Sequence, residues 1–407
     1  MPQSSKESVT SLFDGYIRTD RRPRLHAEPK FTYLNRSPTP AASAIRRLLE
    51  SWFARYPARG RIDLRKRFRS RKDWNHSSAF FELLLRELFL ALGCCVRVHP
   101  RRGGSRGRPD FHVQTPAAGA FYAEATVATG QSRENAARET WMNRVYDWLD
   151  QLESEWFCVG LELHGTPRTQ PPPSKVKAYL SKKLAELDYE QVRRLVESEG
   201  QSALPRWCYM HEGLEIEFFP IPKSARELED PRVRPLRMRM EDARCPDTRK
   251  RIRDAVSRKA KPHKRLHLPY VICVNALGPL VERESAVNAL FGQEQMIMTH
   301  TGPGQVEWGM TRARDGAWIG KSGSKNTRVS AVLLAMNLSP WKVSRASVCL
   351  YHNPWARRPC PSVLDRLPRA VLQGDRLSFE PGESLGEVFG LPDLWPDPDA
   401  FQVRPLT

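Results

Sequence analysis

The feature that most constrains the fold is a strongly apolar helical run that short strands follow at once. The run AFFELLLRELFLALG, residues 79–93, has helical composition and stops at Gly93, where a C-terminal cap glycine would sit. Strand patterns then cover residues 95–99, 109–114 and 120–128, separated by turn-like segments. The sequence therefore predicts a helix followed by three short strands.

A second helix and a fourth strand complete this group. Ser132 fits an N-cap, and large apolar residues recur at helical spacing as far as about Leu152. Residues 156–163 then have the pattern of a strand. The order expected over residues 79–163 is helix, three strands, helix, strand.

We expect three segments in a chain of this length, which is too long for one small core. Residues 1–72 form a basic N-terminal region, with a helix near residues 44–56, that packs on or extends from the next domain. Residues 73–165 hold the core described above. Residues 166–407 form an α+β C-terminal region. Its expected strands are LEIEFFPIP around Ile216, PYVICVNAL around Ile272, residues 328–334 and residues 347–351, with a basic helix over residues 248–261.

The charge balance points to a polyanionic partner. The chain has 65 Lys and Arg against 46 Asp and Glu, a formal net charge of +19, and much of the excess lies in arginine-dense blocks. Nucleic acid is the natural partner of such a surface. The alternative is a solvated basic face without a polyanion.

Cysteine spacing and hydropathy favour a cytoplasmic protein. The eight cysteines include no C-x-x-C pair and no regular framework, so we expect free thiols and neither a zinc site nor disulfides. The start MPQSSKESVT lacks the apolar core of a signal peptide. The most apolar helix is interrupted by Glu82, Arg86 and Glu87, so we expect no membrane span.

Three acidic residues can converge if the strands pair as neighbours. Residues two apart on a strand share a face, so Asp110 and His112 point one way, and Glu124 and Thr126 share a face of the next strand. Glu82 lies among apolar residues, where a lone carboxylate would be costly. The simpler interpretation is that Glu82 forms an ion pair with Arg86 one turn away.

These residues carry a family resemblance. RPDF at residues 108–111, with the glutamate of AEAT fourteen positions after Asp110, resembles the motif of the PD-(D/E)xK nucleases. The resemblance covers less than a quarter of the chain. It implies an α/β fold with a restriction-endonuclease-like αβββαβ core, a mixed sheet flanked by helices. It also implies that Asp110 and Glu124 bind Mg²⁺ or Mn²⁺, with Glu82 completing the acidic site.

The sequence departs from the motif at one position. The catalytic lysine of the family would fall at Thr126, which has no cationic head to stabilise charge. Some relatives supply this group from another element, which leaves Arg133, Arg138 or Lys175 as substitutes. His112 is a candidate base, although a neighbour of the site is its commoner role.

Arginines between the first two strands are candidates for phosphate binding. The loop RRGGSRGR contains Arg101, Arg102, Arg106 and Arg108, directly before Asp110, and its glycines let the backbone approach a partner closely. The basic block over residues 249–265 would extend the phosphate track. The alternatives are a mobile loop with solvated charges and an exposed basic helix.

The expected function is a Mg²⁺-dependent nuclease that cleaves phosphodiester bonds of nucleic acid, with DNA favoured as the substrate and RNA left open. Family association links such proteins to defence against foreign DNA. Two other classes stay open: a nucleic-acid-binding protein on a catalytically degenerate nuclease fold, and a scaffold subunit whose basic blocks meet an acidic protein. A homodimer or a partner protein is compatible with each.

Overall fold

The chain divides into two compact units. The computed structural model describes residues 11–100, 109–129, 133–165, 167–230, 233–241, 247–261, 266–278, 281–302, 305–373 and 376–396. Unit 1 comprises Met1–Arg22, Pro29–Gly130 and Pro246–Thr407, and unit 2 comprises Pro23–Glu28 and Gln131–Cys245. This division differs from the expected segments 1–72, 73–165 and 166–407, because unit 2 is inserted into the sequence of unit 1.

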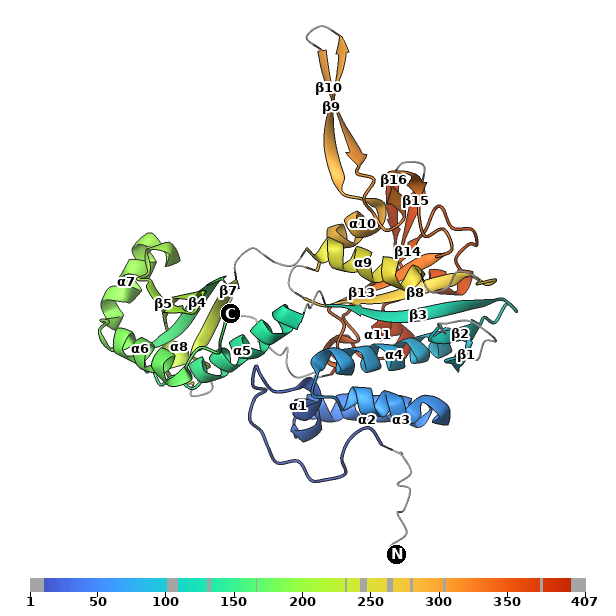
Figure 1. Cartoon of the computed structure of the whole chain (residues 1–407). Helices are drawn as coiled ribbons and strands as arrows, with labels where there is room; N and C mark the ends of the chain where they lie inside the picture. The colour runs from blue at the N-terminus through green and yellow to red at the C-terminus, as the bar shows by residue number, and fades with distance from the viewer. Residues whose placement is uncertain are drawn as a thin grey trace, which may run out of the picture. The chain divides into compact units, whose positions relative to one another are not determined.

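Unit 1 is built on an eight-stranded mixed sheet (Figure 1), with strand order β1-β2-β3-β8-β13-β14-β15-β16. The strands are β1 (Cys95–Val98), β2 (Phe111–Gln114), β3 (Ala120–Ala128), β8 (Tyr270–Ala276), β13 (Ala331–Met336), β14 (Ser347–His352), β15 (Arg369–Gln373) and β16 (Arg376–Glu380). β8 pairs parallel to both β3 and β13, and β14 pairs parallel to β15, whereas the other neighbours are antiparallel. The expected mixed α/β architecture is therefore confirmed.

Apolar cores cover both faces of this sheet. Phe121 and Ala123 of β3 belong to the core beneath α4 (Asp73–Ala91). Tyr122 and Ala128 belong to the opposite core, which includes residues of α9 (Thr248–Ala260) and α10 (Arg283–Phe291). Every residue of β8 is buried, as is typical of a strand covered on both faces.

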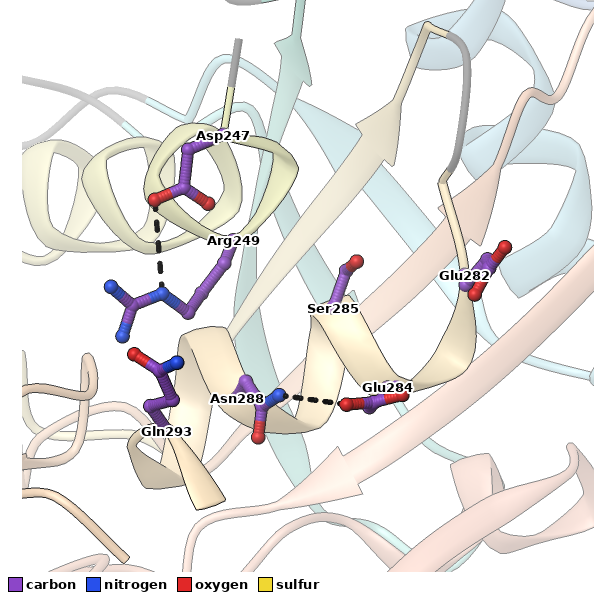
Figure 2. Close-up of a pocket in the computed structure, with 7 residues that line it drawn as sticks. All are labelled: Asp247, Arg249, Glu282, Glu284, Ser285, Asn288 and Gln293. Carbon is purple, nitrogen blue, oxygen red and sulfur yellow. Dashed lines mark hydrogen bonds and ion pairs between the residues drawn. The ribbon is translucent and has the colours of Figure 1, made fainter. Parts of the chain in front are cut away.

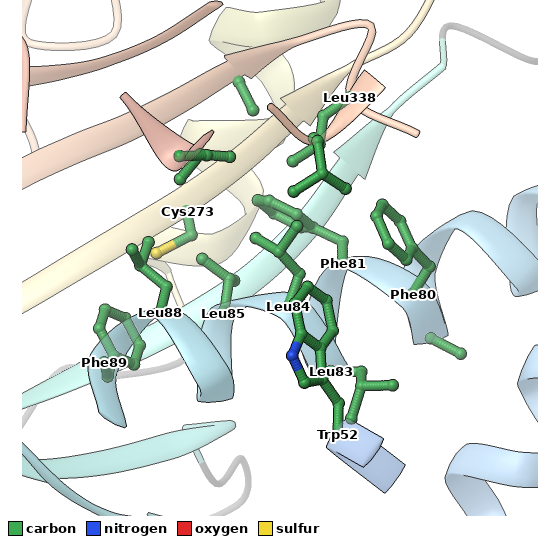
Figure 3. Packing of buried hydrophobic residues seen from close by; sticks show 14 of the residues in the cluster. Trp52, Phe80, Phe81, Leu83, Leu84, Leu85, Leu88, Phe89, Cys273 and Leu338 are labelled. Atoms are coloured by element: carbon green, nitrogen blue, oxygen red, sulfur yellow. The ribbon is translucent and has the colours of Figure 1, made fainter. Parts of the chain in front are cut away.

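α4 is the central helix of the first core (Figure 3). It begins at Asp73, before the apolar run, and His76 and Ser77 in this earlier part are buried. Phe89 packs edge-on against Phe111 and Phe121, with ring centroids 5.8 Å and 5.5 Å away. The expected apolar helix is confirmed. Within the described part of the chain, no helix has the length and apolarity to cross a membrane.

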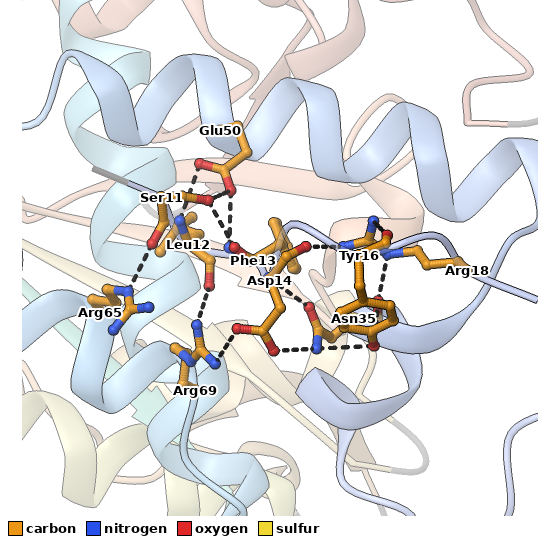
Figure 4. Close-up of polar contacts among 10 residues, drawn as sticks. All are labelled: Ser11, Leu12, Phe13, Asp14, Tyr16, Arg18, Asn35, Glu50, Arg65 and Arg69. Carbon is orange, nitrogen blue, oxygen red and sulfur yellow. Dashed lines mark hydrogen bonds and ion pairs between the residues drawn. The ribbon is translucent and has the colours of Figure 1, made fainter. Parts of the chain in front are cut away.

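The N-terminal region packs on the rest of unit 1. Its helices are α1 (Lys30–Arg36), α2 (Pro40–Ala54) and α3 (Ala58–Phe68), and their buried side chains join the core of α4. Figure 4 shows how the segment before them is held: the Glu50 carboxylate accepts hydrogen bonds from the backbone N–H groups of Leu12 (3.0 Å) and Phe13 (2.8 Å). Of the two arrangements expected for this region, packing is the one found for residues 11–22 and 29–72.

The expected second helix and fourth strand form, but they belong to unit 2. They are α5 (Arg133–Leu149) and β4 (Phe157–Gly165). β4 pairs antiparallel with β6 (Leu214–Pro222) over nine residues, so their apolar side chains share one core. The expectation that this strand joins the first three was therefore wrong, and β8 takes the place beside β3.

Unit 2 is a four-stranded sheet with helices of its own. The strand order is β5-β6-β4-β7, where β5 is Trp207–His211 and β7 is Leu236–Glu241. Its other helices are α6 (Pro173–Ala185), α7 (Tyr189–Glu199) and the short α8 (Ala225–Leu228). The core contains Val145 of α5, Leu161 of β4, Leu180 of α6 and Phe218 of β6.

Removal of the Phe89 ring tests the central core of unit 1. Phe89→Ala leaves a cavity between α4 and the sheet, so we expect the free energy of unfolding to fall by about 3–5 kcal/mol. Urea denaturation followed by circular dichroism measures this loss. Ile62→Ala, at an exposed position of α3, is the control and should change stability by less than about 0.5 kcal/mol. Equal losses in the two variants would contradict the packing described.

Candidate functional site

Asp110 and Glu124 meet through hydrogen bonds to each other's strand. β2 and β3 are neighbours, with Phe111 opposite Ala123. The Asp110 carboxylate accepts the backbone N–H of Ala125 at 2.8 Å, and the Glu124 carboxylate accepts the backbone N–H of Asp110 at 3.2 Å. The Glu124 side chain is 8% exposed and that of Asp110 is 21% exposed. The expected convergence of these two acids is therefore present in the structure.

Glu82 lies in α4 and anchors three other side chains. Its Oε1 accepts the Tyr56 hydroxyl at 2.6 Å and lies 3.3 Å from His99 Nε2. Its Oε2 accepts Arg67 Nη2 at 2.7 Å. The simpler expectation, a pair with Arg86, is not what forms, because Arg86 donates to Glu87 instead. Both oxygens of Glu82 thus already have partners within the protein.

His99 connects Glu82 to Asp110. Its Nδ1 lies 3.9 Å from Asp110 Oδ1, and its backbone N–H donates to the Asp110 carbonyl at 2.7 Å. The residue follows β1 with φ of 43°, in the left-handed region that few non-glycine residues adopt. Such backbone strain is common at functional sites. Sequence reasoning missed His99 because it looked like the end of a strand.

A lysine from a distant segment contacts the acidic pair. Lys259, near the end of α9, places Nζ 2.7 Å from Glu124 Oε1. The neighbouring Arg258 lies 3.5 Å from the Thr126 hydroxyl. α9 therefore brings two cations to the strand where the motif lysine is replaced by Thr126. The basic stretch was visible in the sequence, but nothing there singled out Lys259.

Burial and charge set the pKa values in the site. Burial raises the pKa of Asp110 to about 7, helped by the charges of Glu124 and Glu82 and opposed by Lys259. Burial also acts to raise the pKa of Glu82, but contacts with His99, Arg67 and Tyr56 outweigh it and lower that pKa to about 2. The Glu82 hydrogen bond raises the pKa of His99. Near neutral pH the site thus combines an ionised Glu82 with a titrating Asp110.

The oxygen donors of Asp110 and Glu124 suit a hard divalent cation. Proteins usually hold Mg²⁺ through one or two carboxylates, with waters and substrate phosphates as further ligands. Burial is the main cause of the raised pKa of Asp110, and the nearby charge of Glu124 adds to it, a repulsion that a cation would relieve. Among the described residues, no group of three or more His, Cys, Asp or Glu side chains is arranged to hold a metal ion. The fit is therefore to a two-carboxylate site.

The remaining candidate residues have different outcomes. The ring of His112 lies edge-on to Tyr122, with centroids 5.4 Å apart, on the face of β3 that carries Glu124. Arg101, Arg102, Arg106 and Arg108 lie outside the described residues, as do the side chains of Arg133 and Arg138. Lys175 belongs to α6 of unit 2. The role of the arginine loop in phosphate binding stays a prediction.

The positive charge is concentrated in the unit that holds the acidic site. Unit 1 carries 46 Lys and Arg against 25 Asp and Glu, whereas unit 2 carries 19 against 21. Within unit 1, the basic helix α3 packs against α4, and the basic helix α9 packs against β3. The acidic site thus lies between two arginine-rich helices on opposite faces of the sheet. The positive excess of the chain is therefore confined to unit 1.

A separate hollow of about 380 Å³ lies at the opposite end of α9 from Lys259 (Figure 2). Acidic and polar side chains of α9 and α10, with Gln293, line it. Asp247 and Arg249 are paired there at 3.8 Å. Ten residues of helix separate Arg249 from Lys259, roughly 15 Å along the axis. The hollow is therefore not part of the acidic site.

Comparison with known proteins adds no family assignment. No family model matches the chain, and no curated protein or solved structure matches it. The argument for function accordingly rests on the geometry of the site.

The pKa of Asp110 predicts a stability change with pH. Because folding raises this pKa from 3.8 to about 7, ionisation of Asp110 opposes folding increasingly between these two values. Asp110→Asn removes the cost, so at pH 8 in EDTA the variant should be more stable than wild type by about 1–4 kcal/mol. Urea denaturation at pH 4 and pH 8 measures the difference, which should vanish at pH 4.

Asp254→Asn, at an exposed position of α9, is the control for this measurement. It should show no gain that depends on pH. If Asp110→Asn were no more stable than wild type at pH 8, the raised pKa of Asp110 would be refuted.

Proposed function

We propose that unit 1 is a metal-dependent nuclease that hydrolyses phosphodiester bonds of nucleic acid, preferentially DNA, at the site around Asp110 and Glu124. The observation that carries the proposal is the position of Lys259, whose Nζ lies 2.7 Å from Glu124 Oε1. Stabilisation of a negatively charged transition state requires a cationic group, which Thr126 does not have. The ammonium of Lys259, beside the acidic pair, is such a group.

The order of elements supports a restriction-endonuclease-like core. α4, β1, β2 and β3 follow one another, and after the insertion of unit 2 come α9 and then β8, which pairs parallel to β3. This is the order αβββαβ that the motif around Asp110 and Glu124 implies, with α9 and β8 in place of the expected helix and strand. The resemblance therefore extends beyond the two motif segments.

The residues of the site divide into distinct roles. Asp110 and Glu124 would hold Mg²⁺ or Mn²⁺, which when bound neutralises charge on the phosphate and lowers the pKa of a water. Lys259 stabilises negative charge that develops on phosphate oxygens. Glu82, whose oxygens are taken by Tyr56, Arg67 and His99, is a positioning residue rather than the metal ligand we first expected. It holds the His99 ring beside Asp110.

The charge of unit 1 supports nucleic acid as the substrate. Phosphate contacts by Lys and Arg dominate the affinity of nucleic-acid-binding proteins and make it fall steeply with salt. Unit 1 carries the whole positive excess of the chain. Binding of DNA should accordingly weaken as salt rises.

Binding without cleavage is the second candidate function. Both carboxylate oxygens of Glu124 have partners in the protein, Lys259 and the backbone of Asp110. An acidic cluster whose oxygens already have partners in the protein also fits a nuclease fold that still binds nucleic acid but no longer cleaves it.

A cleavage assay separates the two functions. Labelled single- and double-stranded DNA and RNA are incubated with Mg²⁺, Mn²⁺ or EDTA. We expect metal-dependent cutting by wild type, lost in Asp110→Ala and Glu124→Ala. In Lys259→Met, the rate should fall at least about 10²-fold while the affinity for DNA changes only a few-fold.

Lys342→Met, which removes an exposed lysine of unit 1 outside the site, is the matched control and should cut like wild type. Salt-dependent binding of DNA without cutting under any condition would favour the second function. Cutting by the Asp110→Ala variant would contradict the assignment of the cleavage site to Asp110 and Glu124.

A further inference from the structure

One hairpin of unit 1 stands apart from the main sheet (Figure 1). It consists of β9 (Glu294–Gly302) and β10 (Gln305–Arg312), which pair antiparallel with each other as a separate two-stranded sheet. A two-stranded hairpin without further support is marginally stable in water. A hairpin of this length therefore gains from contact with another surface.

One face of this hairpin is apolar. Met298 lies opposite Trp308, and Met296 lies opposite Met310. Because side chains alternate along a strand, these four share one face. Their exposed fractions are 65% for Met296, 51% for Met298, 66% for Trp308 and 62% for Met310. We call these four side chains the apolar stripe.

An exposed stripe of this kind usually marks an interaction surface. Single exposed apolar residues are common, but contiguous large ones indicate a site for a partner. Methionine and tryptophan are also enriched at protein interfaces, where they adapt their shape or contribute large contact areas. On the opposite face, the described side chains of β9 include Gln295 and Ile297, and Ile297 is 45% exposed, so the larger apolar surface is the one with the stripe.

The charges of the hairpin decide between partners. Over β9 and β10 the charged residues are Glu294, Glu307 and Arg312, and Arg312 pairs with Glu294 at 3.3 Å. The hairpin therefore lacks the cluster of cations that would hold a phosphate backbone, in a unit that is otherwise strongly basic. A nucleic acid or an acidic protein would be drawn to the rest of unit 1 instead.

We propose that the apolar stripe binds the same stripe of a second copy of this chain. A symmetric contact between identical chains needs a self-complementary patch. An uncharged stripe of Met and Trp meets that need, whereas the basic remainder of unit 1 repels its own copy. The two hairpins pack face to face through these four side chains.

The size of the stripe sets the strength of this contact. From the area that a large side chain buries and the exposed fractions above, each copy contributes on the order of 500 Å². A standard interface buries about 800 Å² per partner. An interface below the standard size fits a dimer that dissociates, so association should depend on the concentration of the chain.

Sedimentation velocity of the full chain, freed of nucleic acid, tests the proposal over about 1–200 µM. In about 0.5 M NaCl, which screens the repulsion between basic surfaces, wild type should convert from monomer to dimer as concentration rises. Met298→Ser with Trp308→Ser should raise the Kd at least tenfold. Ile297→Ser, on the opposite face of β9, is the matched control and should leave the Kd unchanged. Circular dichroism checks that each variant is folded.

Three results would overturn the proposal. The first is a monomer throughout the concentration range. The second is a dimer that the stripe variants do not weaken. The third is a stripe variant whose affinity for DNA drops tenfold while its association is unchanged, which would assign the stripe to nucleic acid. These readouts are independent of catalysis, so they hold whether or not the chain cleaves nucleic acid.

Discussion

The parallel pairing of β3 with β8 is the interaction on which unit 1 depends. It joins seven consecutive residue pairs, from Tyr122 with Tyr270 to Ala128 with Ala276, across the whole insertion of unit 2. Both strands are covered by apolar cores on their two faces, so this junction lies at the centre of the unit. Because α9 directly precedes β8, the same pairing sets α9 against β3. The contact between Lys259 and Glu124 follows from that arrangement.

The sequence predicted local elements and the acidic pair well because both depend on nearby residues. The alternation of residues 120–128 defines β3 to the residue, and the neighbouring strand brings Asp110 to Glu124. The pairing partner of a strand is harder to predict, because periodicity identifies a segment as a strand but does not say which strand lies beside it. β4 was therefore assigned to the wrong sheet, although its own bounds were nearly right.

The cations of the site were harder to find than its acids. Lys259 is 135 positions from Glu124, and it is one of many basic residues in its segment. Only the fold selects it, by placing the end of α9 over β3. His99 was hidden for another reason, because its role comes from a left-handed backbone at the end of β1 and from its contact with Glu82.

Because unit 2 is inserted between them in the sequence, the acids of the site and Lys259 are synthesised at different times. During synthesis, Glu82, Asp110 and Glu124 leave the ribosome before the 115 residues from Gln131 to Cys245, and Lys259 follows only after them. At about 5–20 residues per second, this delay is on the order of ten seconds. A nascent chain thus carries the acids without their cation, and without the strand that β3 needs as its neighbour. The order of translation therefore keeps the site incomplete until unit 2 has been made.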